Sequence, residues 1–109
     1  MSAKDRIEAA MDRFAAGDLD GAIEAAKRAI EEDPANADAC EMLGEFCKHA
    51  GRLDEAIEYA TKLVEVDPAN TMGYVNLSRY YMLKGDKETA EYWQEKARGL
   101  TPKAGPKTG

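Results

Sequence analysis

The sequence repeats itself every 34 residues, and this period limits the possible folds more than any other feature of the chain. A glycine, an alanine and a proline each recur three times at this interval, at Gly17, Gly51 and Gly85, at Ala22, Ala56 and Ala90, and at Pro34, Pro68 and Pro102. Such a period is typical of proteins built from stacked structural repeats. We therefore predict one domain over residues 1–102, with repeats at about 3–36, 37–70 and 71–102, and a flexible tail at 103–109.

Each repeat contains two stretches in which apolar residues recur at spacings of three and four, as expected of amphipathic helices. In the second repeat, Ile57, Ala60 and Val64 form such a stripe. The glycine between the stretches ends the first helix, and the proline ends the second. These signals predict six helices joined by short turns, at about 3–16, 19–32, 37–50, 53–66, 71–84 and 87–100.

Composition and charge exclude several classes of function. The 109 residues include 15 Lys and Arg against 21 Asp and Glu, a net charge of -6, and no clustered basic patch of the kind that binds nucleic acid. No stretch approaches the ~20 apolar residues of a membrane-spanning helix, and the N-terminus lacks the apolar run of a secretory signal. We therefore expect a cytoplasmic protein with neither a nucleic-acid partner nor a membrane insertion.

The sequence offers little chemistry for catalysis. The only histidine, His49, stands two residues from Cys47, so on a helix the two side chains point in different directions. Cys40 and Cys47 are too few for a disulfide scaffold or a four-cysteine zinc site, and we expect both to be packed, reduced thiols. We expect no enzyme activity, no metal and no cofactor.

The register resembles the tetratricopeptide repeat. Matching residues in the second repeat are Leu43, Gly44, Gly51, Ala56 and Pro68, and in the third repeat they are Tyr74, Leu77, Ser78, Tyr81, Gly85, Ala90 and Pro102. The resemblance covers residues 3–102 and implies a right-handed superhelical stack of three antiparallel helix pairs. It also implies that the first helices line a concave groove that takes part in protein–protein recognition.

The family's groove positions fall on the first helix of each repeat. The groove residues that the resemblance implies here are Ile7, Met11, Phe14, Met42, Glu45, Met72, Val75, Asn76, Arg79 and Met82. Every methionine except the initiator is in this set, and methionine is common on surfaces that accept apolar partners. Any one of these methionines could instead fill a gap in the core.

One branch of the family binds acidic C-terminal tails through a clamp of Lys, Asn and Arg side chains. The matching positions of this chain are Ile7, Met11, Met42, Met72 and Asn76, and only Asn76 is of a suitable type. With Glu8, Glu41 and Glu45 on the rim of this apolar floor, we expect the ligand to be an apolar, basic peptide or helix of another protein.

A second hypothesis is a structural scaffold that assembles with itself. Tyr92 and Trp93 are adjacent on the last predicted helix, and the extra capping helix common in the family is absent. An apolar patch on the C-terminal helix would pair two chains into a homo-oligomer. Alternatively, Trp93 packs over the neighbouring helix of its own chain.

Overall fold

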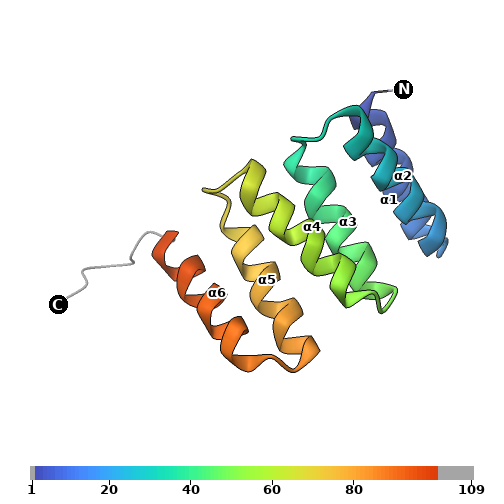
Figure 1. The fold of residues 1–109 in the computed structure, drawn as a ribbon. Coiled ribbons are helices and arrows are strands. Elements are labelled where there is room, and N and C mark those ends of the chain that lie inside the picture. The colour runs from blue at the N-terminus through green and yellow to red at the C-terminus, as the bar shows by residue number, and fades with distance from the viewer. Residues whose placement is uncertain (1, 101–109) are drawn as a thin grey trace.

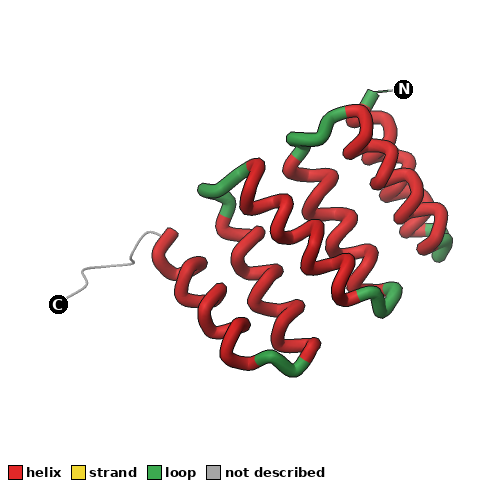
Figure 2. Tube along the Cα trace, viewed as in Figure 1, coloured by secondary structure: helices red, strands yellow, loops and turns green. Residues whose placement is uncertain are grey.

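The computed structural model describes residues 2–100, which form six helices and no strand (Figures 1 and 2). The helices are α1 (Ala3–Ala15), α2 (Leu19–Glu32), α3 (Ala37–His49), α4 (Leu53–Val66), α5 (Thr71–Lys84) and α6 (Lys87–Leu100). All six predicted helices are confirmed, and only α1 and α3 end one residue earlier than expected. The predicted tail at 103–109 lies outside the described residues.

The helices form three antiparallel pairs that follow one another in a right-handed stack, so the predicted architecture is also confirmed (Figure 1). The stack is elongated, with extents of 50 × 29 × 22 Å. Helix α1 packs on α2, α3 on α4 and α5 on α6, while α2–α3 and α4–α5 contacts join successive pairs. None of the helices within residues 2–100 is long and apolar enough to cross a membrane.

Each pair turns at a glycine whose backbone is left-handed. The φ angles are 84° at Gly17, 77° at Gly51 and 92° at Gly85. A residue with a Cβ atom is strained in this conformation by roughly 1–2 kcal/mol, which explains why glycine recurs at this point of every repeat. The turns between pairs are completed by Asn36 and Asn70, whose side chains accept hydrogen bonds from the backbone N–H groups of α3 and α5.

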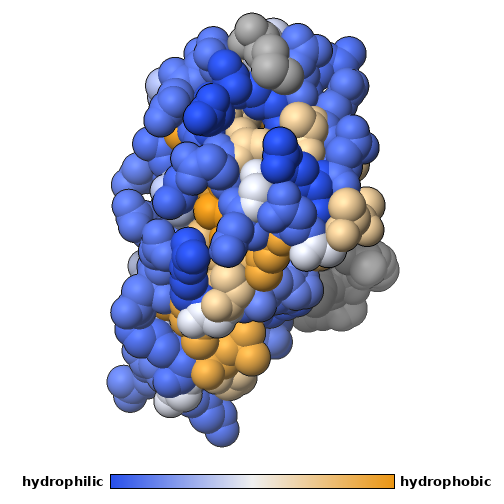
Figure 3. Space-filling view, turned by 90° about the vertical axis from the view of Figure 1, so that its right-hand side faces the viewer, coloured by the Kyte–Doolittle hydropathy of each residue, from blue (hydrophilic) through white to orange (hydrophobic). Residues whose placement is uncertain are grey.

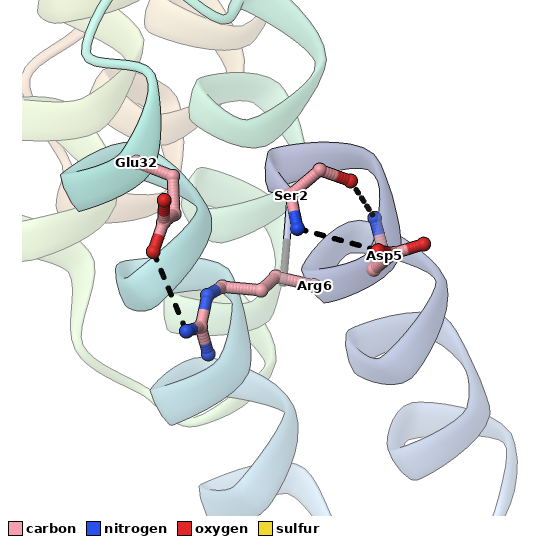
Figure 4. A network of polar contacts seen from close by, with 4 residues as sticks. All are labelled: Ser2, Asp5, Arg6 and Glu32. Carbon is pink, nitrogen blue, oxygen red and sulfur yellow. Dashed lines mark hydrogen bonds and ion pairs between the residues drawn. The ribbon is translucent and has the colours of Figure 1, made fainter.

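The N-terminal end of the stack is closed by polar contacts (Figure 4). Ser2 and Asp5 form a reciprocal capping box at the start of α1. From the next turn, Arg6 extends across to α2 and its Nη2 lies 3.4 Å from Glu32 Oε2. In the register of the repeats Arg6 corresponds to Cys40, which is buried between two pairs. The first repeat therefore has a charged side chain, paired with Glu32, where the second repeat has a buried thiol.

Small residues allow the helices of the core to approach closely. Ala22, Ala56 and Ala90, one in the second helix of every repeat, have no exposed surface. Around them lie the largest fully buried side chains: Leu43, Leu63, Leu77, Tyr80 and Asn76, together with Cys40 and Cys47. Both cysteines are free and buried, as expected.

Candidate functional site

Helices α1 and α3 enclose a hollow of about 310 Å³ on the side formed by the first helices of the repeats. We name it the acidic hollow, and it is lined by Ile7, Met11, Asp38, Glu41, Met42 and Glu45. Residues one turn apart share a face of a helix, so Ile7 and Met11 on α1 lie together opposite the side chains of α3. Met11 is 55% exposed, whereas Ile7 and Met42 are half-buried. Four predicted groove residues from two repeats thus meet around one opening.

A second hollow, of about 570 Å³, lies between α3 and α5. We name it the basic hollow, and it is lined by Lys48, His49, Arg79, Met82 and Leu83. Met82 and Leu83 are exposed, so apolar surface is available here too. The sequence analysis missed Lys48, although it stands 34 residues before Met82 and the repeat register places both at the same point of their helices.

A third hollow, of about 260 Å³, lies between α5 and α6 and joins the predicted groove residues Val75, Arg79 and Met82 to Gln94 and Ala97 on α6, which were not predicted. It is lined by Val75, Ser78, Arg79, Met82, Gln94 and Ala97. Gln94 and Ala97 correspond to Ala60 and Leu63 of the second repeat, which are buried. Within residues 2–100 only α5 packs on α6, so Gln94 stays exposed, whereas Ala97 is buried against α5.

Phe14 and Met72 lie apart from the other predicted groove residues. The ring of Phe14 stacks on Phe46 with centroids 4.9 Å apart and lies 5.4 Å from His49, so it links α1 to α3 beside the basic hollow. Met72 is exposed at the start of α5 and lines none of the three hollows.

Figure 3 looks onto the α1–α2 side of the stack and shows apolar side chains in a stripe between hydrophilic margins.

The prediction that Asn76 lines the groove needs correction. Its side chain is only 1% exposed, and Oδ1 has no hydrogen-bond partner among residues 2–100. The physical reason is its position on α5: with Gly73, Leu77 and Tyr80 it forms a stripe at spacings of three and four, and all four residues are buried. Asn76 therefore lies beneath the surface and presents nothing to a ligand.

Glu45 lines the acidic hollow and forms an ion pair with Lys48, which lines the basic hollow. Its Oε2 accepts a hydrogen bond from the hydroxyl of Tyr80, and its Oε1 lies 3.2 Å from Lys48 Nζ. Burial acts to raise the pKa of Glu45, but the Tyr80 hydrogen bond and the Lys48 ion pair outweigh it and lower the pKa. Burial and this same hydrogen bond raise the pKa of Tyr80 above its usual range. Glu45 therefore stays ionised and fixed.

The pKa of Glu41 is raised, whereas that of Glu45 is lowered. Burial, followed by the negative charges of Asp38 and Glu45, raises the pKa of its carboxyl group. No cation in the described chain forms an ion pair with Glu41 or with Asp38. The acidic hollow consequently carries negative charge that the described residues leave uncompensated.

The two aromatic residues proposed for self-association differ in exposure. Tyr92 is 54% exposed, and its ring meets Trp93 edge-on at a centroid distance of 5.0 Å. Trp93 is half-buried and lies 6.0 Å from the ring of Tyr74 on α5. Trp93 thus packs over the neighbouring helix, and Tyr92 supplies the exposed part of the patch.

The described residues hold no arrangement typical of a catalytic or metal site. Among residues 2–100 no group of three His, Cys, Asp or Glu side chains could hold a metal ion. Burial raises the pKa of Cys47 to about 11, which keeps its thiol protonated at neutral pH. The hollows that the structure shows are lined by apolar and charged side chains.

Three helix pairs stacked in register, with hollows along their first helices, define a helical-repeat protein. A family model described as tetratricopeptide repeat matches residues 13–85, which is 73 of the 109 residues. The chain belongs to this family. No curated protein sequence matches the chain.

Similar solved structures include a crystal structure of the MamA protein, with 28% identity and a TM-score of 0.87 over 91% of this chain and 54% of that one. The chain therefore spans about half the length of that protein. The second TPR of Spaghetti (RPAP3), bound to the HSP90 peptide SRMEEVD, is 20% identical with a TM-score of 0.84, covering 93% of this chain and 94% of that one. YrrB, described as a TPR protein with an unusual peptide-binding site, is 22% identical with a TM-score of 0.86, covering 94% and 53%.

Proposed function

We propose that the chain is a protein-interaction module, and not an enzyme, whose groove binds a short apolar segment of a partner protein. The observation that carries this proposal is the acidic hollow, in which Ile7, Met11 and Met42 from two repeats surround one opening. Half-buried and exposed apolar side chains around a concave opening gain free energy when a ligand removes them from water. Flexible methionine side chains also adapt to the shape of a ligand.

The same residues argue against an acidic C-terminal tail held by a carboxylate clamp. Four of the five clamp positions carry Ile7, Met11, Met42 and Met72, which supply no positive charge, and the fifth, Asn76, is buried. The Spaghetti domain holds an HSP90 peptide on a similar scaffold, and YrrB has an unusual peptide-binding site. These relatives support peptide binding as a use of the scaffold, while the side chains of this chain favour a different, apolar ligand.

The proposal is tested by selecting binders from a display library of random 12-residue peptides and measuring their affinity for variants. We expect Met42→Glu to remove binding, because it places a carboxylate in an apolar part of the hollow next to Glu41 and Glu45. Ala69→Glu in the turn between α4 and α5 is the matched control, since Ala69 is exposed and lines none of the hollows. Circular dichroism must show unchanged helicity. Selected peptides that bind Met42→Glu as tightly as the original chain would contradict the proposal.

Self-assembly through α6 stays a second hypothesis, supported by the exposed ring of Tyr92. Burying one aromatic side chain in a symmetric contact stabilises a dimer only modestly, so we expect association at high protein concentration. Sedimentation velocity over a range of concentrations tests this hypothesis. Tyr92→Glu should shift the equilibrium toward the monomer, and a strict monomer at every concentration would rule the scaffold out.

A further inference from the structure

The two hollows of the groove carry opposite charges and share helix α3. Asp38 and Glu41 stand in the acidic hollow near the start of α3, and Lys48 and His49 stand in the basic hollow at its end. Helix α5 adds Arg79 to the basic hollow. The charge of the groove therefore changes from negative to positive along α3. Neither the net charge of the chain nor the acidic rim alone indicates this change.

The charges that remain available are those at the two outer ends. At the boundary, Glu45 and Lys48 are 3.2 Å apart and neutralise each other, and Tyr80 satisfies the second oxygen of Glu45. In contrast, Glu41 and Arg79 form no ion pair with any side chain in the part of the chain that the structure describes. The charge of Arg79 also helps to lower the pKa of Glu45, so Lys48 and Arg79 share one carboxylate and leave one positive charge in excess. A ligand would thus meet excess negative charge at one end and excess positive charge at the other.

The spacing of these ends sets the size of a matching ligand. Arg79 on α5 corresponds to Glu45 in the repeat register, so it stands four positions beyond Glu41 and seven beyond Asp38, or ~6–10 Å along the helices. Neighbouring helix axes lie ~8–10 Å apart, so the two ends are roughly 10–14 Å from each other. An extended peptide advances by ~3.3 Å per residue. About three to five residues therefore separate a ligand side chain in the acidic hollow from one in the basic hollow.

We propose that the groove binds an amphipathic peptide segment with both charges in a fixed order: a Lys or Arg in the acidic hollow, apolar residues between, and an Asp or Glu beside Arg79. This inference rests on the proposed function and narrows the apolar segment proposed there to one that carries both a basic and an acidic residue. The apolar residues of the segment pack on Met11 and Met42 at one end and on Met82 and Leu83 at the other. A uniformly basic segment would place one of its charges against Arg79, where like charges repel.

The test uses the 12-residue peptides that the display library yields, at about 150 mM salt so that long-range attraction to the acidic chain is screened. We expect the peptides to carry a basic and an acidic residue three to five positions apart. Arg79→Glu should weaken their binding on the order of tenfold, because it places a negative charge next to the acidic residue of the peptide. Arg79→Ala should weaken binding less, because it only removes the attractive positive charge. Arg28 is an exposed arginine on α2 that forms no ion pair within residues 2–100. Arg28→Glu changes the net charge equally and should leave the affinity unchanged.

A second selection against Arg79→Glu separates this inference from the proposed function. If the inference holds, the acidic residue disappears from the newly selected peptides and basic residues take its place. If peptides bind the original chain and lose affinity with Met42→Glu, but show no acidic residue and tolerate Arg79→Glu, the groove binds peptides and the bipolar ligand is wrong. If Met42→Glu has no effect either, the proposed function fails as well.

Discussion

The hydroxyl of Tyr80 offers a sharp test of how the groove is held together. Tyr80 is fully buried on α5, and its hydroxyl donates a hydrogen bond to Glu45 on α3, 35 residues earlier in the chain. Tyr80→Phe removes only this hydroxyl and keeps the ring that fills the core. The substitution therefore isolates one link between the second and third repeats.

The expected loss of stability follows from the type of bond. A hydrogen bond to a charged group contributes roughly 1.5–3 kcal/mol. The Glu45 side chain is 29% exposed and keeps its ion pair with Lys48. Water can therefore hydrogen-bond to the carboxylate oxygen that the Tyr80 hydroxyl no longer contacts. We therefore expect Tyr80→Phe to lower the free energy of unfolding by about 1–2 kcal/mol.

Urea unfolding followed by circular dichroism measures this change, and a double-mutant cycle with Glu45→Ala isolates the pair. The cycle should give a coupling free energy of about 1 kcal/mol. The pKa of Glu45 lies below its ordinary value of 4.5 in the folded chain, so the stabilisation is present above pH 4.5 and is lost as the pH falls through the folded pKa. Additive single mutants, or a loss that does not become smaller as the pH falls below 4.5, would refute the reasoning.

Three further outcomes follow from the packing. A Cβ atom on Gly73 would lie only 2.8 Å from Val64 Cγ1, so Gly73→Ala should lower the melting temperature. A Cβ atom on Gly44 would lie 3.4 Å from the Tyr80 hydroxyl, which is an ordinary contact distance, so Gly44→Ala should leave the melting temperature unchanged. Gly51→Ala should cost about 1 kcal/mol in urea unfolding, because the φ angle of 77° strains any residue with a Cβ atom, and an unchanged midpoint would contradict this. Cys40 and Cys47 should react with iodoacetamide at pH 8 only after unfolding, because both are buried and the pKa of Cys47 is about 11. Alkylation of the native protein, detected by mass spectrometry, would contradict this prediction.

The helices could be predicted from the sequence because their end signals are local. A glycine that must adopt a positive φ angle and a proline that excludes helical geometry before it are both effective within a few residues. Repetition strengthened these signals, since Gly17, Gly51 and Gly85 mark equivalent positions of the three units. The helix bounds consequently agreed to within one residue.

The groove could be predicted only in part. The register placed Ile7, Met11, Met42 and Met82 on the side where the hollows lie, because equivalent helices present equivalent faces. It failed for Asn76, which the register placed in the groove although its position in the buried stripe of α5 required burial.

Other features of the site depend on contacts between distant parts of the chain. The bond between Tyr80 and Glu45 has no local signature, because it joins side chains on two different repeats. The opening beside Gln94 lies on the last helix of the described stack, where Gln94 is exposed although its counterpart Ala60 in the second repeat is buried. Only the packed structure brings such residues together.

The central claim, that the first helices form the binding surface, is tested most directly by nuclear magnetic resonance. Adding a library-selected peptide to the ¹⁵N-labelled chain should shift the amide signals of α1, α3 and α5, with the largest changes near Met11, Met42 and Arg79. Amides on α2 and α4, such as that of Glu58, should stay unchanged. Shifts concentrated on α2, α4 or α6 would show that the peptide binds elsewhere and would contradict the claim.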